Sequence, residues 1–132
     1  MWRSRSAAAA VASDLAPLDG DPRALEQVLV NLVDNAVKYC PAGTTVTLAA
    51  ANDGDDALRI GVEDTGPGID AKHLPRVFER FYRVDKGRSR DVGGTGLGLY
   101  ISRELVLRMN GRIWVDSDGR TGSSFFLELP VA

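Results

Sequence analysis

The stretch DPRALEQVLVNLVDNAVKY, residues 21–39, decides how this chain begins to fold. Asp21 followed by Pro22 is typical of a helix start, because a carboxylate caps the free amides and proline fits the first helical position. Beyond them the apolar residues recur with the period of an α-helix and leave one continuous apolar face. They are Leu25, Val28, Leu29, Leu32, Val33, Ala36 and Val37. We therefore expect a helix that runs to about Tyr39 and packs on a core.

A polar stripe runs beside that apolar face. It is formed by Gln27, Asn31, Asn35 and Lys38, which point in similar directions because successive residues are rotated by about 100°. A carboxamide oxygen is a hard, neutral ligand that suits Mg²⁺, and an ammonium group can neutralise a phosphate. A solvated helix face would explain the stripe equally well, so the other motifs must decide between the two interpretations.

The pattern of apolar residues after this helix predicts the remaining elements. We expect strands at residues 44–51 and 58–63, a short helix at 74–81, a long helix at 96–109, and strands at 112–117 and 123–129. Hairpin strands with helices between them predict an α+β fold, a two-layer α/β sandwich with a mixed, mostly antiparallel sheet and helices packed on one face. We expect residues 1–18 to be a flexible lead-in to a folded domain at residues 19–132.

Length and composition indicate one globular domain of 132 residues, 44% hydrophobic and 26% charged. The single cysteine, Cys40, excludes an internal disulfide. No apolar run approaches the length that spans a bilayer. The net charge of −2 is unevenly distributed along the sequence. Residues 72–90 form a basic block that contains seven Lys or Arg and only two acidic residues. Such a block indicates a small anionic ligand or an acidic partner, with a solvated charged face as the alternative.

The segment EDTGPGID, residues 63–70, places Asp64 where a buried strand ends. A carboxylate there can accept a hydrogen bond from an exocyclic amine, such as that of adenine. Gly66 and Gly68 would let a flat base approach the main chain, although a tight turn alone would also explain glycines.

The segment GGTGLGL, residues 93–99, places three glycines, Gly94, Gly96 and Gly98, just before the long helix. Free backbone amides at a helix N-terminus bind phosphate oxygens. The segment lacks the lysine of a P-loop, and no strand leads straight into it as in a dinucleotide-binding fingerprint. Because the basic block precedes it, cations and amides are expected to converge on one anion.

Five motifs in order give the chain a family resemblance: NLVDNAVKY, EDTGPGID, FERFYRVD, GGTGLGLYISRELV and GSSFFLELP. Over about residues 19–130 the chain resembles the catalytic ATP-binding domain of bacterial sensor histidine kinases, which belongs to the GHKL superfamily and has the Bergerat fold. The chain departs from complete kinases in having no His-x-x-Arg-x-Pro phosphoacceptor helix. The resemblance implies that residues 1–18 are the end of a linker from a dimerisation and phosphoacceptor domain.

The resemblance also implies the cofactors and the residues that hold them. ATP and Mg²⁺ would bind together, with Asn35 as the metal ligand. The catalytic residues would be Asn31, Lys38, Arg83 and Arg80. The residues that contact ATP would be Asn31, Asn35, Lys38, Tyr39, Asp64, Gly66, Gly68, Gly94, Thr95, Gly96, Leu97, Gly98 and Ser124.

The implied reaction is transfer of the γ-phosphate of ATP to a histidine on a separate phosphoacceptor domain. In hydrolases and serine kinases of the superfamily a glutamate stands where this chain has Asn31, and that glutamate acts as a general base on water or a hydroxyl. A neutral imidazole already offers a lone pair, so asparagine favours histidine phosphorylation. The alternatives are a GHKL ATPase or serine-type kinase, and a nucleotide-binding regulatory module without catalysis.

The implied partners are the kinase's own dimerisation and phosphoacceptor domain and, through the full-length kinase, a response regulator. We expect no nucleic acid and no direct membrane contact. The isolated domain would be a monomer, and the full-length kinase a homodimer. The domain would lie in the cytoplasm, as part of a membrane-anchored sensor.

Overall fold

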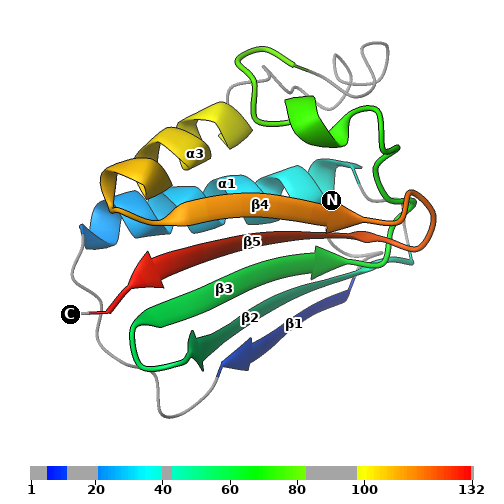
Figure 1. Ribbon diagram of the computed structural model, residues 1–132. Coiled ribbons are helices and arrows are strands. Elements are labelled where there is room, and N and C mark those ends of the chain that lie inside the picture. Colours follow the sequence, from blue (N-terminus) through cyan, green and yellow to red (C-terminus); the bar gives the residue numbers. More distant parts are fainter. Residues whose placement is uncertain (1–5, 12–20, 40–42, 83–97, 132) are drawn as a thin grey trace.

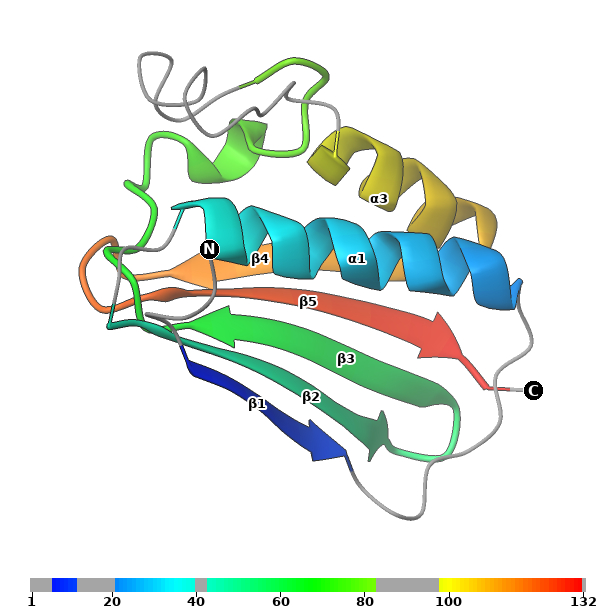
Figure 2. The same cartoon turned by 180° about the vertical axis from the view of Figure 1, so that it is seen from behind.

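The structure is a computed structural model that describes residues 6–11, 21–39, 43–82 and 98–131. It has two layers, a twisted sheet and a helical layer that covers one of its faces (Figure 1). The helical layer consists of α1 (Pro22–Tyr39) and α3 (Gly98–Arg108), which lie side by side on the same face of the sheet (Figure 2). The predicted α+β sandwich is therefore confirmed. Among the described residues, no helix is long and apolar enough to cross a membrane.

The sheet has five strands in the order β1-β2-β3-β5-β4. Their bounds are Ser6–Val11 for β1, Thr45–Asp53 for β2, Ala57–Asp64 for β3, Arg112–Ser117 for β4 and Ser123–Pro130 for β5. Only the pairing of β1 with β2 is parallel, and the other three pairings are antiparallel. The predicted mixed, mostly antiparallel sheet is confirmed, and β2 to β5 match the four expected strands closely.

The core lies between the sheet and the two helices α1 and α3, and regular alternation along the strands builds its sheet side. In β5, Phe125, Leu127 and Leu129 are buried toward the helices. They meet Val28 and Leu32 of α1, which are fully buried, as the helical period predicts. At the start of α1 the carboxylate of Asp21 accepts a hydrogen bond from the amide of Arg23 at 2.9 Å. The expected cap is therefore present.

Among the described residues, no helix lies on the other face of the sheet (Figure 1), and an aromatic and charged cluster covers part of that face. The rings of Trp114 and Phe126 stack with centroids 5.5 Å apart, and the guanidinium of Arg59 lies 5.2 Å from the Trp114 centroid. Glu128, only 15% exposed, pairs with Arg59 at 3.1 Å and with Arg112 at 3.3 Å. These side chains therefore pack against one another on the face away from the helices.

Two elements differ from the sequence prediction. Part of the N-terminal segment expected to be flexible, Ser6–Val11, forms β1 and extends the sheet beside β2. The helix expected at residues 74–81 is reduced to a 3₁₀ turn, η1 (Leu74–Arg76), followed by further turns with bonds between residues three apart. Phe81 has a positive φ of 64°, which no helix accepts, and its ring is 63% exposed. Phe78 instead packs against the core ring of Phe125.

Candidate functional site

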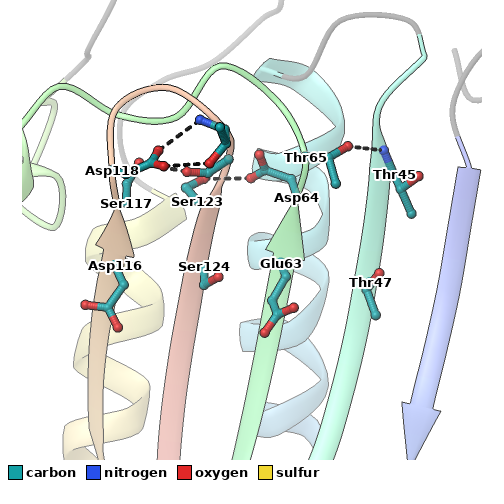
Figure 3. Close-up of a pocket in the computed structure, with 12 residues that line it drawn as sticks. Thr45, Thr47, Glu63, Asp64, Thr65, Asp116, Ser117, Asp118, Ser123 and Ser124 are labelled. Carbon is teal, nitrogen blue, oxygen red and sulfur yellow. Dashed lines mark hydrogen bonds between the residues drawn. The ribbon is translucent and has the colours of Figure 1, made fainter.

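Asp64 lies at the carboxyl end of β3 (Figure 3), and hydrogen bonds hold both of its carboxylate oxygens in place. One oxygen accepts a hydrogen bond from the amide of Gly66 at 3.0 Å, and the other accepts from the hydroxyl of Ser123 at 2.7 Å. Each carboxylate oxygen has a second lone-pair site. The half-buried side chain is thus oriented by the protein and can still accept a hydrogen bond from a ligand amine.

The sequence did not indicate that Ser123 contacts Asp64. It is 8% exposed and faces the helical layer, as do Phe125 and Leu127 two and four residues later. Ser124, assigned to the nucleotide by the resemblance, lies on the opposite face of β5, in register with Glu63 (Figure 3). The alternation along β5 was the signal that could have separated the two serines.

The segment after Asp64 is also fixed to β2. The amide of Thr45 donates to the hydroxyl of Thr65 at 2.8 Å, and the amide of Thr65 donates to the carbonyl oxygen of Thr45 at 3.1 Å. Gly66 is buried, and Gly68 has a φ of 82°, which favours glycine. The loop that carries the two glycines therefore starts from a fixed position.

Asn31 joins the two helices of the layer. Its carboxamide nitrogen donates to the carbonyl oxygen of Gly98 at 3.3 Å, and its oxygen accepts from Gln27 at 2.8 Å. Gly98 is the first residue of α3, and its carbonyl oxygen also accepts from the buried hydroxyl of Ser102 at 2.9 Å. The start of α3 is thereby held against the middle of α1.

The rest of the polar stripe continues along α1 in the direction of its C-terminus. Asn35 is half-buried one turn after Asn31. Lys38 is also partly exposed and pairs with Asp34 at 3.0 Å, an ion pair of i,i+4 spacing. Because both partners are accessible, this pair contributes little to stability, and the ammonium group can turn to an incoming anion.

Arg80 is directed to the start of α3. Its guanidinium donates to the hydroxyl of Tyr100 at 2.8 Å and lies 4.7 Å from the centroid of that ring. The hydrogen bond to Tyr100 raises the pKa of Arg80, which therefore keeps its charge. Five other predicted site residues, Arg83, Gly94, Thr95, Gly96 and Leu97, lie outside the described residues, as does the side chain of Tyr39.

A recess of about 520 Å³ lies at the same end of the sheet and opens onto the face away from the helices (Figure 3). Asp64 and Ser123 lie at its edge, but Glu63, Asp116 and Asp118 also line it. These carboxylates would repel a triphosphate. Phosphate groups therefore fit better on the helical side, where Lys38, Arg80 and the N-terminus of α3 lie.

The residues described contain no group of three or more His, Cys, Asp or Glu that could hold a metal ion. Mg²⁺ often binds to proteins through only one or two side-chain oxygens and completes its shell with phosphate oxygens and water. The carboxamide of Asn35, near the expected position of the phosphates, fits that requirement.

Known proteins resemble the chain in sequence and structure. The family model described as histidine kinase-, DNA gyrase B-, and HSP90-like ATPase matches residues 20–132. The sensor histidine kinase WalK of Bacillus subtilis (strain 168) is 46% identical over 83% of the chain and 18% of WalK. The adaptive-response sensory kinase SasA of Synechococcus elongatus (strain ATCC 33912 / PCC 7942 / FACHB-805) is 40% identical over 98% of the chain and 34% of SasA. The chain thus spans only 18% and 34% of the length of these two relatives.

Solved structures give the same result. The mycobacterial sensor histidine kinase MprB superposes with a TM-score of 0.80 at 28% identity, over 97% of this chain and 83% of that one. Full-length ShkA in complex with AMPPNP superposes with a TM-score of 0.82 at 36% identity, over 97% of this chain and 26% of ShkA.

Proposed function

Because this chain belongs to the family of histidine kinase-, DNA gyrase B- and HSP90-like ATPases and is the ATP-binding catalytic domain of a sensor histidine kinase, we propose that it transfers the γ-phosphate of ATP to a histidine on a separate phosphoacceptor domain. The observation that carries the proposal is the oriented carboxylate of Asp64 at the strand end, beside a helix that presents Asn31, Asn35 and Lys38.

Asp64 receives the adenine. The amide of Gly66 and the hydroxyl of Ser123 occupy one position on each carboxylate oxygen and leave the others for the exocyclic amine of the base. Adenine carries that amine and guanine carries a carbonyl at the same ring position, so an acceptor here selects ATP over GTP. Gly66 and Gly68 shape the floor on which the base lies.

The phosphates lie toward the start of α3. Gly98 there, together with the preceding Gly94, Thr95, Gly96 and Leu97, offers backbone amides to phosphate oxygens. Lys38, Arg80 and Arg83 add positive charge. Asn35 would hold Mg²⁺, which, when bound, supplies further charge neutralisation on the phosphates.

Asn31 positions the site and does not take a proton. A carboxamide is not a base. Its hydrogen bond from Gln27 orients it on α1, and its own hydrogen bond to the carbonyl oxygen of Gly98 ties α1 to the start of α3. The imidazole of an acceptor histidine attacks through its own lone pair, so catalysis depends on positioning and on charge neutralisation. Water, which would need a base, is poorly activated at this site.

The proposed partners follow from the family. A phosphoacceptor domain provides the histidine, and a response regulator receives the phosphoryl group from it. We propose that the isolated domain is a monomer that binds no nucleic acid and makes no direct membrane contact, and that it works on the cytoplasmic side within a homodimeric, membrane-anchored kinase.

The test is to mix the chain with Mg²⁺-ATP and the phosphoacceptor domain of its own kinase, and to follow acid-labile, base-stable phosphorylation. We expect phosphohistidine on the acceptor, and none when the acceptor histidine is replaced by alanine. No phosphohistidine, under conditions where the intact kinase forms it, would refute the proposal. Acid-stable phosphoserine or steady phosphate release would instead indicate a serine-type kinase or an ATPase. Tight ATP binding with no transfer would indicate a regulatory module.

A further inference from the structure

The turn between β4 and β5, residues 118–122, is held against the loop that follows Asp64, and the hydroxyl of Ser117, the last residue of β4, makes the connection. Ser117 Oγ accepts a hydrogen bond from the amide of Ile69 at 2.8 Å and another from the amide of Gly119 at 3.2 Å, and it donates to the carbonyl oxygen of Gly122 at 2.9 Å. A hydroxyl offers one donor and two acceptor sites, so the hydrogen-bonding capacity of Ser117 is fully used.

Backbone contacts on both sides of this hydroxyl bring the turn and the loop together. A Cβ atom added to Gly68 would lie 2.8 Å from the amide nitrogen of Arg120 and 2.9 Å from Ser117 Oγ. A Cβ atom added to Gly122 would lie 2.0 Å from the carbonyl oxygen of Asp64. The two segments therefore touch main chain to main chain, and small shifts of the turn must move the loop.

The loop has two fixed ends. At its start, the side chain of Asp64 and the pairing of Thr45 with Thr65 hold the backbone. At its far end, the hydrogen bond from Ile69 to Ser117 holds it. Between these ends lie Gly66, Pro67 and Gly68, which form no helix or strand. Without the hydroxyl of Ser117, the part-buried amide of Ile69 would lose its partner, and the second fixed point would be lost.

We propose that Ser117 is a positioning residue for adenine, which it never touches. By holding Ile69 it sets the height of the Gly66–Gly68 floor relative to the carboxylate of Asp64, and so sets how well the site distinguishes adenine from guanine. The inference rests on the proposed adenine position at Asp64. It does not depend on phosphotransfer, because nucleotide binding is measured on the chain alone.

The test compares binding of ATP and GTP, each with Mg²⁺, to three variants by calorimetry. We expect Ser117→Ala to weaken ATP binding about tenfold and to change GTP binding by less than about twofold, so that the ATP preference falls. Ser117→Thr keeps the hydroxyl and should restore ATP affinity to within about twofold of the original.

Thr121→Val is the matched control. It removes a hydroxyl from the same turn, but that hydroxyl donates to Asp118 at 2.6 Å, within the turn. We expect a lower melting temperature with an unchanged ratio of ATP to GTP affinity. Equal weakening of both nucleotides by Ser117→Ala, unchanged ATP affinity in that variant, or a loss of ATP preference in Thr121→Val would each overturn the proposal.

Hydrogen exchange in the unaltered chain gives a readout that does not depend on any variant folding. The amide of Ile69 should be protected, because Ser117 accepts its hydrogen bond. Exchange of this amide at the rate of an unprotected peptide would refute the inference even if Ser117→Ala did not fold.

Discussion

Replacing Asp64 by asparagine tests the assignment of the adenine site directly. Asparagine has nearly the same shape, and its remaining oxygen can still accept the hydrogen bond that Gly66 now donates at 3.0 Å. Its nitrogen would face Ser123, whose hydroxyl can rotate and accept. The internal hydrogen bonds therefore survive, and the fold should keep its stability within about 1 kcal/mol.

Nucleotide binding should be affected far more than the fold. The variant loses the negative charge and presents an NH₂ group to the adenine amine, so a charged hydrogen bond worth about 1.5–3 kcal/mol disappears. That loss corresponds to about a 10- to 150-fold weaker affinity for ATP. Calorimetry with Mg²⁺-ATP measures the affinity, and thermal unfolding followed by circular dichroism verifies the fold.

Glu63→Gln is the control for Asp64→Asn. It removes the same charge one residue earlier in β3, where the side chain points to the open face of the sheet (Figure 3). We expect its ATP affinity to stay within about twofold of the original, because this exposed side chain lies on the opposite face of β3 from the carboxylate of Asp64. If Asp64→Asn bound ATP as well as the original, or if Glu63→Gln weakened binding equally, the adenine assignment would be incorrect.

Three further outcomes are expected. With Mg²⁺-ATP alone the chain should release little phosphate. Asn31→Ala should leave the rate of phosphate release within about twofold of the original, because the substitution removes no base. Steady release by the original chain that is lost in Asn31→Ala would indicate a hydrolase. Gly122→Ala should lower the free energy of unfolding in denaturant by about 3 kcal/mol or more, since the added Cβ would lie 2.0 Å from a carbonyl oxygen. Gly54→Ala, at a positive φ but with open space around the added Cβ, should lower it by about 1–2 kcal/mol. Equal losses in the two variants would contradict the close approach. Hydrogen bonds from the Thr121 hydroxyl and, to a smaller extent, from backbone amides lower the pKa of Asp118 from 3.8 to about 2. These bonds therefore stabilise the turn above pH 3.8, and the stabilisation is lost as pH falls through 2. Carbon NMR should find that midpoint for the Asp118 carboxyl, and Thr121→Val should raise it.

The sequence was sufficient to predict elements whose pattern arises from burial. α1 follows from its apolar spacing, and β3 and β5 follow from alternation against the core. β1 could not be predicted in this way, because its alanine-rich segment has no alternation and joins the sheet by parallel pairing of its backbone along the edge of β2. The 3₁₀ turn η1 was not predicted either, and a helix was expected in its place. The apolar pattern there does not reveal the positive φ of Phe81, which a helix cannot include.

For the candidate site residues, the sequence predicts the position in the fold where a residue ends a strand or follows the helical period. Asp64 lies at the expected strand end, and Asn31 lies on α1 as its spacing predicts. Ser123 was missed because two adjacent serines differ only in which face of β5 they occupy. Ser117 could not be found, since its hydrogen bond to Ile69 joins residues 48 apart in the chain.

The two ends of the sheet invite different uses in protein engineering. The turn between β2 and β3, near Gly54, has no atoms within 4 Å of an added Cβ. Asp64 is the last of the eight residues of β3, which extend over roughly 25 Å from the end next to this turn. A fluorophore, an affinity tag or an inserted reporter domain placed there should leave nucleotide affinity intact. The same insertion between Ser117 and Gly122 should separate the turn from the loop after Asp64, which this turn supports. The β4–β5 turn would therefore be a suitable place for an inserted domain that abolishes ATP binding.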